Sequence, residues 1–412
     1  MIRTAILACC ITIAALTNAQ AQSEAEFRTF IQSLWPEAEA VGVSRATFDE
    51  ATRGLRPNLS LPDLVIPGKP KAAPKGQPEF ERTPAQYLSE TSLARLAGQG
   101  RRLAAEHRAT LAAIEQKFGV PPSVILAIWG RETNFGKFRL PHNAIEVLAT
   151  QAWLGRRKEM FRGEFLLALK ILDEQHVSRP GMKASWAGAM GHTQFLPTDF
   201  YKFGVDFDGD GHRDIWNSVP DALASAASQL LAKGWDKGKR WGFEVKPPAQ
   251  VDCSIAEPDT RLTVAQWIER GYVPLTQQPS ADELAEEASL FLPAGLKGPA
   301  FLTLNNFYVF KAYNFADLYA LFVGNLSDRI AGERSFETPW GRIEQARSDQ
   351  IETIQRHLTE AGFYRDKIDG KAGMKTRAAL GAWQKANGVT LDCWPSRGLA
   401  ERMSARRSSE AR

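Results

Sequence analysis

Apolar residues recur at helical spacing through most of this chain of 412 residues, while patterns typical of strands are few. Short strand candidates are limited to residues 243–245 and 300–304. The pattern therefore predicts a mainly α fold in which strands play a minor part. The helices that we expect lie at 93–118, 121–132, 145–154, 157–175, 220–233, 264–270 and 316–330.

The N-terminus has the pattern of a secretion signal. Arg3 precedes an apolar run over residues 5–16, and a small-x-small cleavage pattern ends at Ala21. The run is shorter than the ~20 apolar residues that a spanning helix needs. Lipid attachment at Cys9 or Cys10 is disfavoured, because the apolar stretch before them is too short for a signal core. We expect a periplasmic protein that is cut after Ala21 and not attached to the membrane.

Changes in composition along the chain suggest its domain boundaries. We expect the signal at 1–21, a helical arm and a Pro/Lys-rich linker at 22–79, a large helical domain at 80–345 and a compact three-helix domain at 346–405. The net charge of +4 is too small to indicate nucleic-acid binding.

Two cysteines, Cys253 and Cys393, remain after removal of the signal. An oxidising compartment would permit a bridge between them. Nothing in their spacing brings them together, so we expect two separate buried thiols, with the bridge as the alternative.

The strongest catalytic candidate is Glu132, near the end of the segment 119–136. Pro121 and Pro122 suit the start of a helix, and Gly136 suits its end. Spacing then puts Glu132 on an apolar face, where desolvation and the helix dipole are expected to raise its pKa. Such a group can protonate the leaving oxygen of a glycosidic bond. The alternative from spacing alone is a structural glutamate paired with Arg131 or another base.

The segment around Glu132, together with Ser185-Trp-Ala-Gly-Ala-Met-Gly-His-Thr-Gln-Phe-Leu-Pro197, resembles the lytic murein transglycosylases of the membrane-bound B type. The resemblance extends to about residue 345 and implies an α+β, lysozyme-like catalytic domain. It also implies that Glu132 is a single acid/base that cleaves the MurNAc-GlcNAc bond of peptidoglycan and leaves 1,6-anhydroMurNAc ends. No partner acid stands at 133–142, which fits that scheme.

The resemblance also assigns residues to substrate binding. Ser185 would be a hydrogen-bond partner of Glu132, and a basic pair would meet the carboxylates of the peptide stem. The predicted binding set is Tyr87, Arg156, Arg157, Ser185, Gln194, Phe195, Tyr313, Asn314 and Tyr319. Without the resemblance, the arginines read as a solvated helix face and the loop as a tightly packed Gly-rich turn.

Residues 206–214 repeat the first half of an EF-hand loop, with acids at positions one, three and five and glycine at position six. Asn217 stands at position twelve instead of glutamate, and the resemblance suggests Asp221 as its replacement. We expect a structural Ca²⁺ site, with a plain acidic turn as the alternative. Zinc is disfavoured because the histidines show no His-Glu-x-x-His pattern. The predicted ligands are Asp206, Asp208, Asp210, the His212 carbonyl and Asp221.

The segment 351–399 resembles the common peptidoglycan-binding domain through its Ile368-Asp-Gly370 turn and its Ala382-Trp-Gln-Lys-Ala-Asn-Gly388 run. Cys393 stands where that family usually has glycine in a turn. The leading hypothesis is a monomeric lytic transglycosylase whose partners are glycan strands and possible other cell-wall enzymes. The rivals are a hydrolytic muramidase and an inactive wall-binding scaffold.

Overall fold

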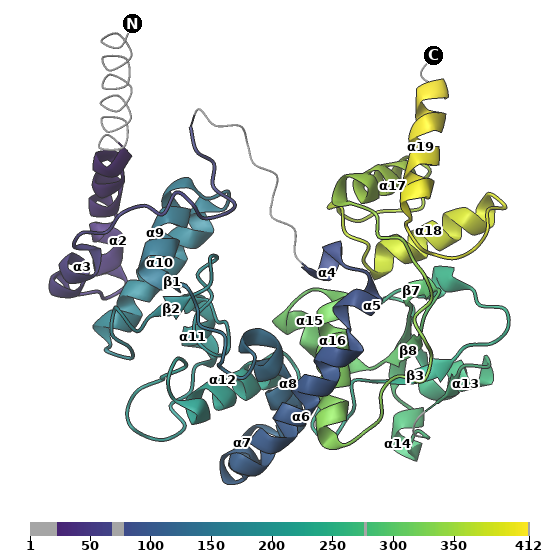
Figure 1. Ribbon diagram of the computed structural model, residues 1–412, viewed down its shortest axis with the longest axis horizontal. Coiled ribbons are helices and arrows are strands. Elements are labelled where there is room, and N and C mark those ends of the chain that lie inside the picture. The colour runs from purple at the N-terminus through teal and green to yellow at the C-terminus, as the bar shows by residue number, and fades with distance from the viewer. Residues whose placement is uncertain (1–22, 68–77, 276–277, 411–412) are drawn as a thin grey trace, which may run out of the picture. The chain divides into compact units, whose positions relative to one another are not determined.

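The structure is a computed structural model that describes residues 23–67, 78–275 and 278–410 (Figure 1). The signal at 1–21 and most of the Pro/Lys-rich linker lie outside the described residues. The chain forms two compact units. Among the described residues, unit 1 comprises 23–67 and 132–228, and unit 2 comprises 78–131, 229–275 and 278–410. The chain passes from one unit to the other within helices α8 (Pro122–Thr133) and α12 (Val219–Ala232).

Unit 1 is built on two packed helices, α9 and α10. Asn143 caps α9 by accepting the backbone N–H groups of Ile145 and Glu146, and nearly all of that helix is buried. Ser44 caps α3 and also donates to Asp173 at the end of α10, which fixes the N-terminal arm to this pair. Residues 23–33 are also helical. The elements of unit 1 are α2 (Trp35–Ala40), α3 (Arg45–Thr52), β1 (His142–Asn143), α9 (Ala144–Leu154), α10 (Lys158–Asp173), β2 (Lys183–Ala184), α11 (Pro197–Phe203) and α12 (Val219–Ala232).

Unit 2 contains the long helical segment predicted at 93–118, which the structure divides at His107 into α6 and α7. Neither glycine nor proline marks this break in the sequence. The helices of unit 2 are α4 (Pro78–Glu81), α5 (Pro84–Tyr87), α6 (Glu90–Glu106), α7 (Arg108–Phe118), α8 (Pro122–Thr133), α13 (Val264–Glu269), α14 (Ala281–Leu284), α15 (Asn305–Tyr313), α16 (Asp317–Ala331), α17 (Ser348–Glu360), α18 (Met374–Ala386) and α19 (Arg397–Glu410).

A five-stranded sheet, with strand order β4-β6-β8-β3-β5, is also part of unit 2. Neighbours are antiparallel, and Val245 pairs with Ala300 where β3 meets β8. The two predicted strands are thus present and adjacent, while the other strands of the sheet were not predicted. Its apolar core includes Trp267, Leu290 and Leu302. The strands of unit 2 are β3 (Gly242–Lys246), β4 (Leu262–Thr263), β5 (Val273–Pro274), β6 (Glu287–Phe291), β7 (Pro293–Leu296) and β8 (Ala300–Thr303).

The C-terminal helices α17, α18 and α19 enclose their own apolar core, drawn in yellow-green and yellow in Figure 1. The Gln355 side chain holds the turn after α17. Its Oε1 accepts the N–H groups of Asp369 and Gly370, and its Nε2 donates to the Asp369 carboxylate at 3.0 Å. The expectation of a mainly α chain with a small three-helix C-terminal domain is confirmed.

The expectation of two separate thiols is wrong, because Cys253 and Cys393 form a disulfide with their Cα atoms 6.1 Å apart. Folding brings the C-terminal domain against the sheet, and Cys393 lies in the same apolar cluster as Cys253. Cys393 has a φ of 50° and takes the left-handed backbone usual for glycine. The Gln384 Oε1 stabilises this turn by accepting the Cys393 N–H at 2.9 Å.

A buried ion pair joins the same two parts. The Asp317 carboxylate lies 3.1 Å from the Arg377 guanidinium of α18, and both side chains are less than a tenth exposed. Lys311 lies 2.5 Å from the other carboxylate oxygen, and the Met374 N–H donates to Asp317 at 3.0 Å. The C-terminal domain is therefore docked within unit 2 by a covalent link and a desolvated charge cluster.

Within the described ranges, no single helix is long and apolar enough to span a membrane. The pair α7 and α8, bent by 108°, passes the same test of length and composition when taken together.

Candidate active site

Helix α8 carries Glu132 at its C-terminal end. Its residues Ile125, Ile128 and Trp129 are buried, as the apolar spacing predicted, and Glu132 itself is half-buried. The three residues at 134–136 all have positive φ, with values of 51°, 57° and 74°. Two of these are not glycine, so the backbone after Glu132 is held in a conformation that side chains disfavour. The chain thus turns away sharply directly beyond the candidate acid.

Thr133 fixes this turn to the second motif. Its hydroxyl accepts the Gly136 N–H at 3.1 Å and donates to the His192 carbonyl at 3.4 Å. A Cβ on Gly136 would collide with the His192 ring, so only glycine allows this approach. The two motifs, about fifty residues apart in the sequence, therefore meet within unit 1.

The second motif is a tight loop held by its own side chains. The Ser185 Oγ accepts the N–H groups of Ala187 and Ala189, and the Gln194 amide donates to the carbonyls of Ala189 and Gly191. Gln194 also has a positive φ of 55°. These side chains therefore shape the loop, while the hydrogen bond predicted between Ser185 and Glu132 and the substrate contact predicted for Gln194 stay predictions. Phe195, the third predicted residue, is 1% exposed and packs against Phe203.

A cavity of about 130 Å³ lies where the two motifs meet. Its wall includes Thr133, His192, Trp216 and Phe138, and the Phe138 side chain is 60% exposed. Burial lowers the pKa of His192, which keeps its imidazole neutral beside the helix end. The sequence analysis did not select Phe138 or His192, although an aromatic residue six positions after Glu132 was a visible signal.

In unit 2, Tyr87 is held by a charged pair. Its hydroxyl donates to Glu79 at 3.0 Å and accepts from the Arg131 Nε at 3.0 Å, and the Arg131 guanidinium lies 4.9 Å from the Tyr87 ring centroid. Burial raises the pKa of Tyr87, which is 6% exposed. These contacts anchor Arg131, the residue that precedes Glu132 in α8. A cleft role for Tyr87 stays a prediction.

The other aromatic residues predicted for substrate binding lie at the turn between α15 and α16. The rings of Tyr313 and Tyr319 stack with centroids 6.3 Å apart and an interplanar angle of 10°. Tyr319 is 1% exposed, whereas Tyr313 is half-buried. The Asn314 Oδ1 accepts the Ala316 N–H at 3.2 Å and helps to start α16.

The basic pair lies at the start of α10 in unit 1, beside a shallow depression of about 430 Å³. Arg156 forms an ion pair of 2.8 Å with Asp63. The Arg157 guanidinium lies 5.1 Å from the Phe161 ring centroid. Because Asp63 balances the charge of Arg156, Arg157 is the better placed of the two to meet an incoming carboxylate.

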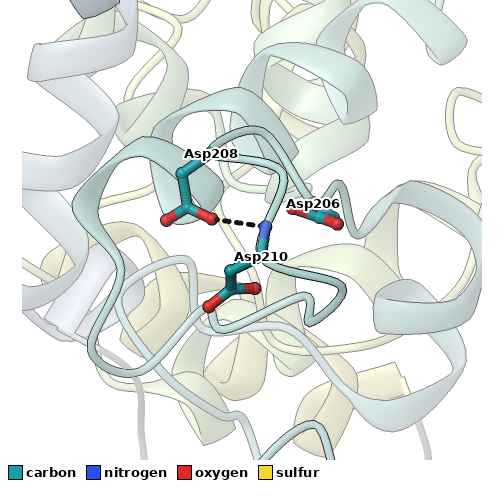
Figure 2. Close-up of side chains that lie close together, drawn as sticks. All are labelled: Asp206, Asp208 and Asp210. Atoms are coloured by element: carbon teal, nitrogen blue, oxygen red, sulfur yellow. Dashed lines mark hydrogen bonds between the residues drawn. The ribbon is translucent and has the colours of Figure 1, made fainter.

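The acidic loop brings together Asp206, Asp208 and Asp210, whose carboxylate oxygens lie within 4.8 Å of one another (Figure 2). A set of oxygen ligands from partly or fully exposed side chains fits a hard divalent cation. Asp221 is not in this group. Its carboxylate accepts the N–H groups of Phe207, Asp208 and Asp214, so it holds the loop from within. Burial raises the pKa of Asp221.

His212, the remaining predicted ligand, is exposed, and its N–H donates to the Asp210 carboxylate at 2.8 Å. Ser218 was not predicted to take part, yet its hydroxyl donates to Asp208 at 2.7 Å. The roles of Asp221 and of the His212 carbonyl as ligands stay predictions.

Comparison with known proteins gives the same reading of the chain. The transglycosylase SLT domain matches residues 26–328, and a peptidoglycan binding domain matches residues 347–392. These domains define the class, which is that of the lytic transglycosylases, enzymes that act on peptidoglycan. The transglycosylase SLT domain covers well over half of the chain. The chain therefore belongs to the transglycosylase SLT family.

Individual proteins of this class are also similar to the chain. SltB3 of Pseudomonas aeruginosa, solved in complex with NAG-NAM-pentapeptide, is 39% identical with a TM-score of 0.82 over 92% of this chain and 99% of that one. The same protein in complex with NAG-anhNAM-pentapeptide is 38% identical with a TM-score of 0.80 and the same coverage.

Two further matches come from Escherichia coli. Membrane-bound lytic murein transglycosylase B is 34% identical over 218 residues, which are 52% of this chain and 58% of that relative, less than two thirds of its length. Lytic transglycosylase Slt35 in complex with calcium is 29% identical with a TM-score of 0.51, over 60% of this chain and 77% of that one.

Proposed function

We propose that this protein is a peptidoglycan lytic transglycosylase that cleaves the MurNAc-GlcNAc β-1,4 bond and leaves 1,6-anhydroMurNAc ends. The observation that carries the proposal is the position of Glu132. It is half-buried at the end of an apolar helix, and the next residue, Thr133, makes the hydrogen bond to His192 that connects the two motifs. Similarity over nearly the whole chain to a protein solved with both a NAG-NAM and a NAG-anhNAM ligand supports it.

In this proposal Glu132 acts twice. As an acid it protonates the bridging oxygen, so that the bond from the anomeric carbon breaks and the GlcNAc hydroxyl leaves. As a base it then takes the proton of the MurNAc C6 hydroxyl, whose oxygen bonds to the same carbon. Among the described residues that line the neighbouring cavity, none is an aspartate or glutamate. The proposed reaction needs one carboxylate, because the sugar's own hydroxyl takes the place that water has in the two-carboxylate schemes of hydrolysis.

The test is digestion of purified sacculi by residues 22–412 and by a Glu132→Gln variant, with mass spectrometry of the soluble products. Products one water lighter than the hydrolysed ones should appear with the wild type and vanish with Glu132→Gln. The exposed Glu115→Gln on α7 is the matched control and should retain full activity. Full-mass reducing products would instead indicate a muramidase, and a wild type that releases no product would indicate a scaffold.

We propose further that the loop of Asp206, Asp208 and Asp210 binds Ca²⁺, which would stabilise unit 1 without taking part in the chemistry. The close carboxylates and the calcium complex of Slt35 support this. In protein treated with EDTA, Ca²⁺ should raise the melting temperature of the wild type, and Mg²⁺ should do so less. Asp208→Asn should abolish the effect, while the exposed Asp282→Asn of α14 should keep it. No shift in the wild type would refute the site.

Export to the periplasm is also a proposal, supported by the basic residue, apolar run and small-x-small pattern of residues 1–21. Expression of the full chain in a Gram-negative host should give a periplasmic product whose mass corresponds to cleavage after Ala21. A product that keeps residues 1–21 would contradict it.

A further inference from the structure

A cavity of about 210 Å³ lies where the docked C-terminal domain meets the rest of unit 2. It is lined from one side by Phe80 of α4 and by Phe315 of the turn before α16. From the other side it is lined by Tyr364 and Lys371 of the C-terminal domain. The cavity therefore exists only because the two parts are held together.

An aromatic pair forms part of the cavity wall. The rings of Phe80 and Phe315 stack with centroids 5.9 Å apart and an interplanar angle of 17°, and Phe315 is 56% exposed. The Lys371 ammonium lies 4.1 Å from the Phe315 centroid and 4.7 Å from that of Phe80. Contact with the ring faces attracts the ammonium and holds it at the cavity.

Three lysines and three aspartates line the cavity, and one of these carboxylates, that of Asp369, accepts the Gln355 amide and the Lys371 backbone N–H at 3.0 Å each. Lys311 is paired with Asp317 at 2.5 Å. Lys375 lies 3.2 Å from Asp259 and 3.9 Å from Asp366. In the part of the chain that the structure describes, Lys371 has no carboxylate within 4.0 Å, so it is the cavity's lysine that can take an anion from outside.

One residue of the cavity is a sequence neighbour of two residues predicted to bind substrate. Phe315 directly follows Asn314, and Tyr313 is the last residue of α15. A volume of about 210 Å³ accommodates the end of a peptide and is small for a disaccharide. An apolar ring beside an ammonium suits a small apolar side chain that ends in a carboxylate.

We propose that this cavity binds the carboxylate end of a peptidoglycan stem peptide, with the carboxylate on Lys371 and the adjoining aliphatic side chain on Phe315. The inference rests on the proposed function, since it deepens the account of how that substrate is recognised. The docked C-terminal domain then contributes a side chain to stem recognition, in addition to any contact with the glycan that it makes elsewhere.

The experiment measures binding of glycan fragments with pentapeptide stems to full mature chains carrying Glu132→Gln, which prevents cleavage. Adding Lys371→Ala should raise the dissociation constant at least about tenfold, the contribution of one charge-assisted hydrogen bond. Phe315→Ala should also weaken binding, and because that side chain is mostly exposed it serves as a second variant that keeps the fold. The matched control is Lys367→Ala, an exposed lysine of the same domain that does not line the cavity, and it should bind as the parent does.

The same fragments with their stems removed by an amidase separate a stem site from a glycan site. Binding of these fragments should not change with Lys371→Ala. Equal losses for both kinds of fragment, or no loss for the fragments with stems, would overturn the proposal. Failure of the proposed function is distinguishable, because it would appear as absent cleavage by the wild type whatever the binding results.

Discussion

The disulfide between Cys253 and Cys393 allows a stability prediction worked from the structure. It closes a segment of 140 residues. A cross-link of that span lowers the entropy of the unfolded chain by an amount worth about 5 kcal/mol, and native disulfides typically contribute roughly 2–4 kcal/mol. Both sulfurs lie in the apolar core beside the sheet, so we choose a double Cys→Ala variant, which leaves no polar group there. We expect it to lose at least about 2 kcal/mol of the free energy of unfolding.

The assay is urea unfolding of the oxidised wild type and the double variant at pH 7, followed by tryptophan fluorescence. Mass spectrometry under non-reducing conditions first establishes that the wild type carries the bridge. Dithiothreitol should lower the free energy of unfolding of the wild type toward that of the variant. It should leave the free energy of unfolding of the variant unchanged. A difference below about 0.5 kcal/mol between the bridged wild type and the variant would refute the loop-closure reasoning.

Three further predictions concern unit 2. Asp317→Asn leaves Arg377 buried without its carboxylate and should cost roughly 3–5 kcal/mol in urea unfolding; a loss below about 1 kcal/mol would contradict the buried pair. Burial, aided by a neighbouring acid, raises the pKa of Asp328 to about 7. The folded state therefore keeps a proton that the unfolded state releases above pH ~4, so its contribution to stability falls as pH rises to about 7. Asp328→Asn should remove this pH dependence, so the difference in free energy of unfolding between wild type and variant should change between pH ~4 and about 7. A difference that stays constant over this range would contradict the raised pKa of Asp328. Gly381→Ala would drive a Cβ into the bridge sulfur and should lower the melting temperature; Gly163→Ala, on an open face of α10, is its control and should not lower it.

Much of the helical framework was predictable from the sequence, because amphipathic spacing and capping residues are local signals. Helix α8, with its proline start and its turn at Gly136, lies within one or two residues of the predicted bounds. The sheet was mostly missed for a physical reason. Residues 288–291 of β6 are buried without interruption, so they lack the alternation of apolar and polar residues that identifies a half-exposed strand.

The site was predicted in part. The sequence identified both motifs, but it did not show that Thr133 and His192 would join them, since a hydrogen bond between distant loops leaves no periodic trace. The disulfide was missed for a related reason, because sequence supplies no geometry across 140 residues. The loop around Asp206 was visible because its ligand spacing is local.

The docking of the C-terminal domain bears on how the protein can be divided. The composition suggests a cut near residue 345, but such a cut would remove Arg377 from beside Asp317 and Cys393 from the apolar cluster of the sheet. The fragment that ends near residue 345 would expose Asp317 and an unpaired Cys253, both of which the intact chain keeps from water. The boundary suggested by composition is therefore not one at which the chain can be cut into two parts that fold alone. A loss of activity after such a truncation would reflect damage to the remaining part as well as the missing binding domain.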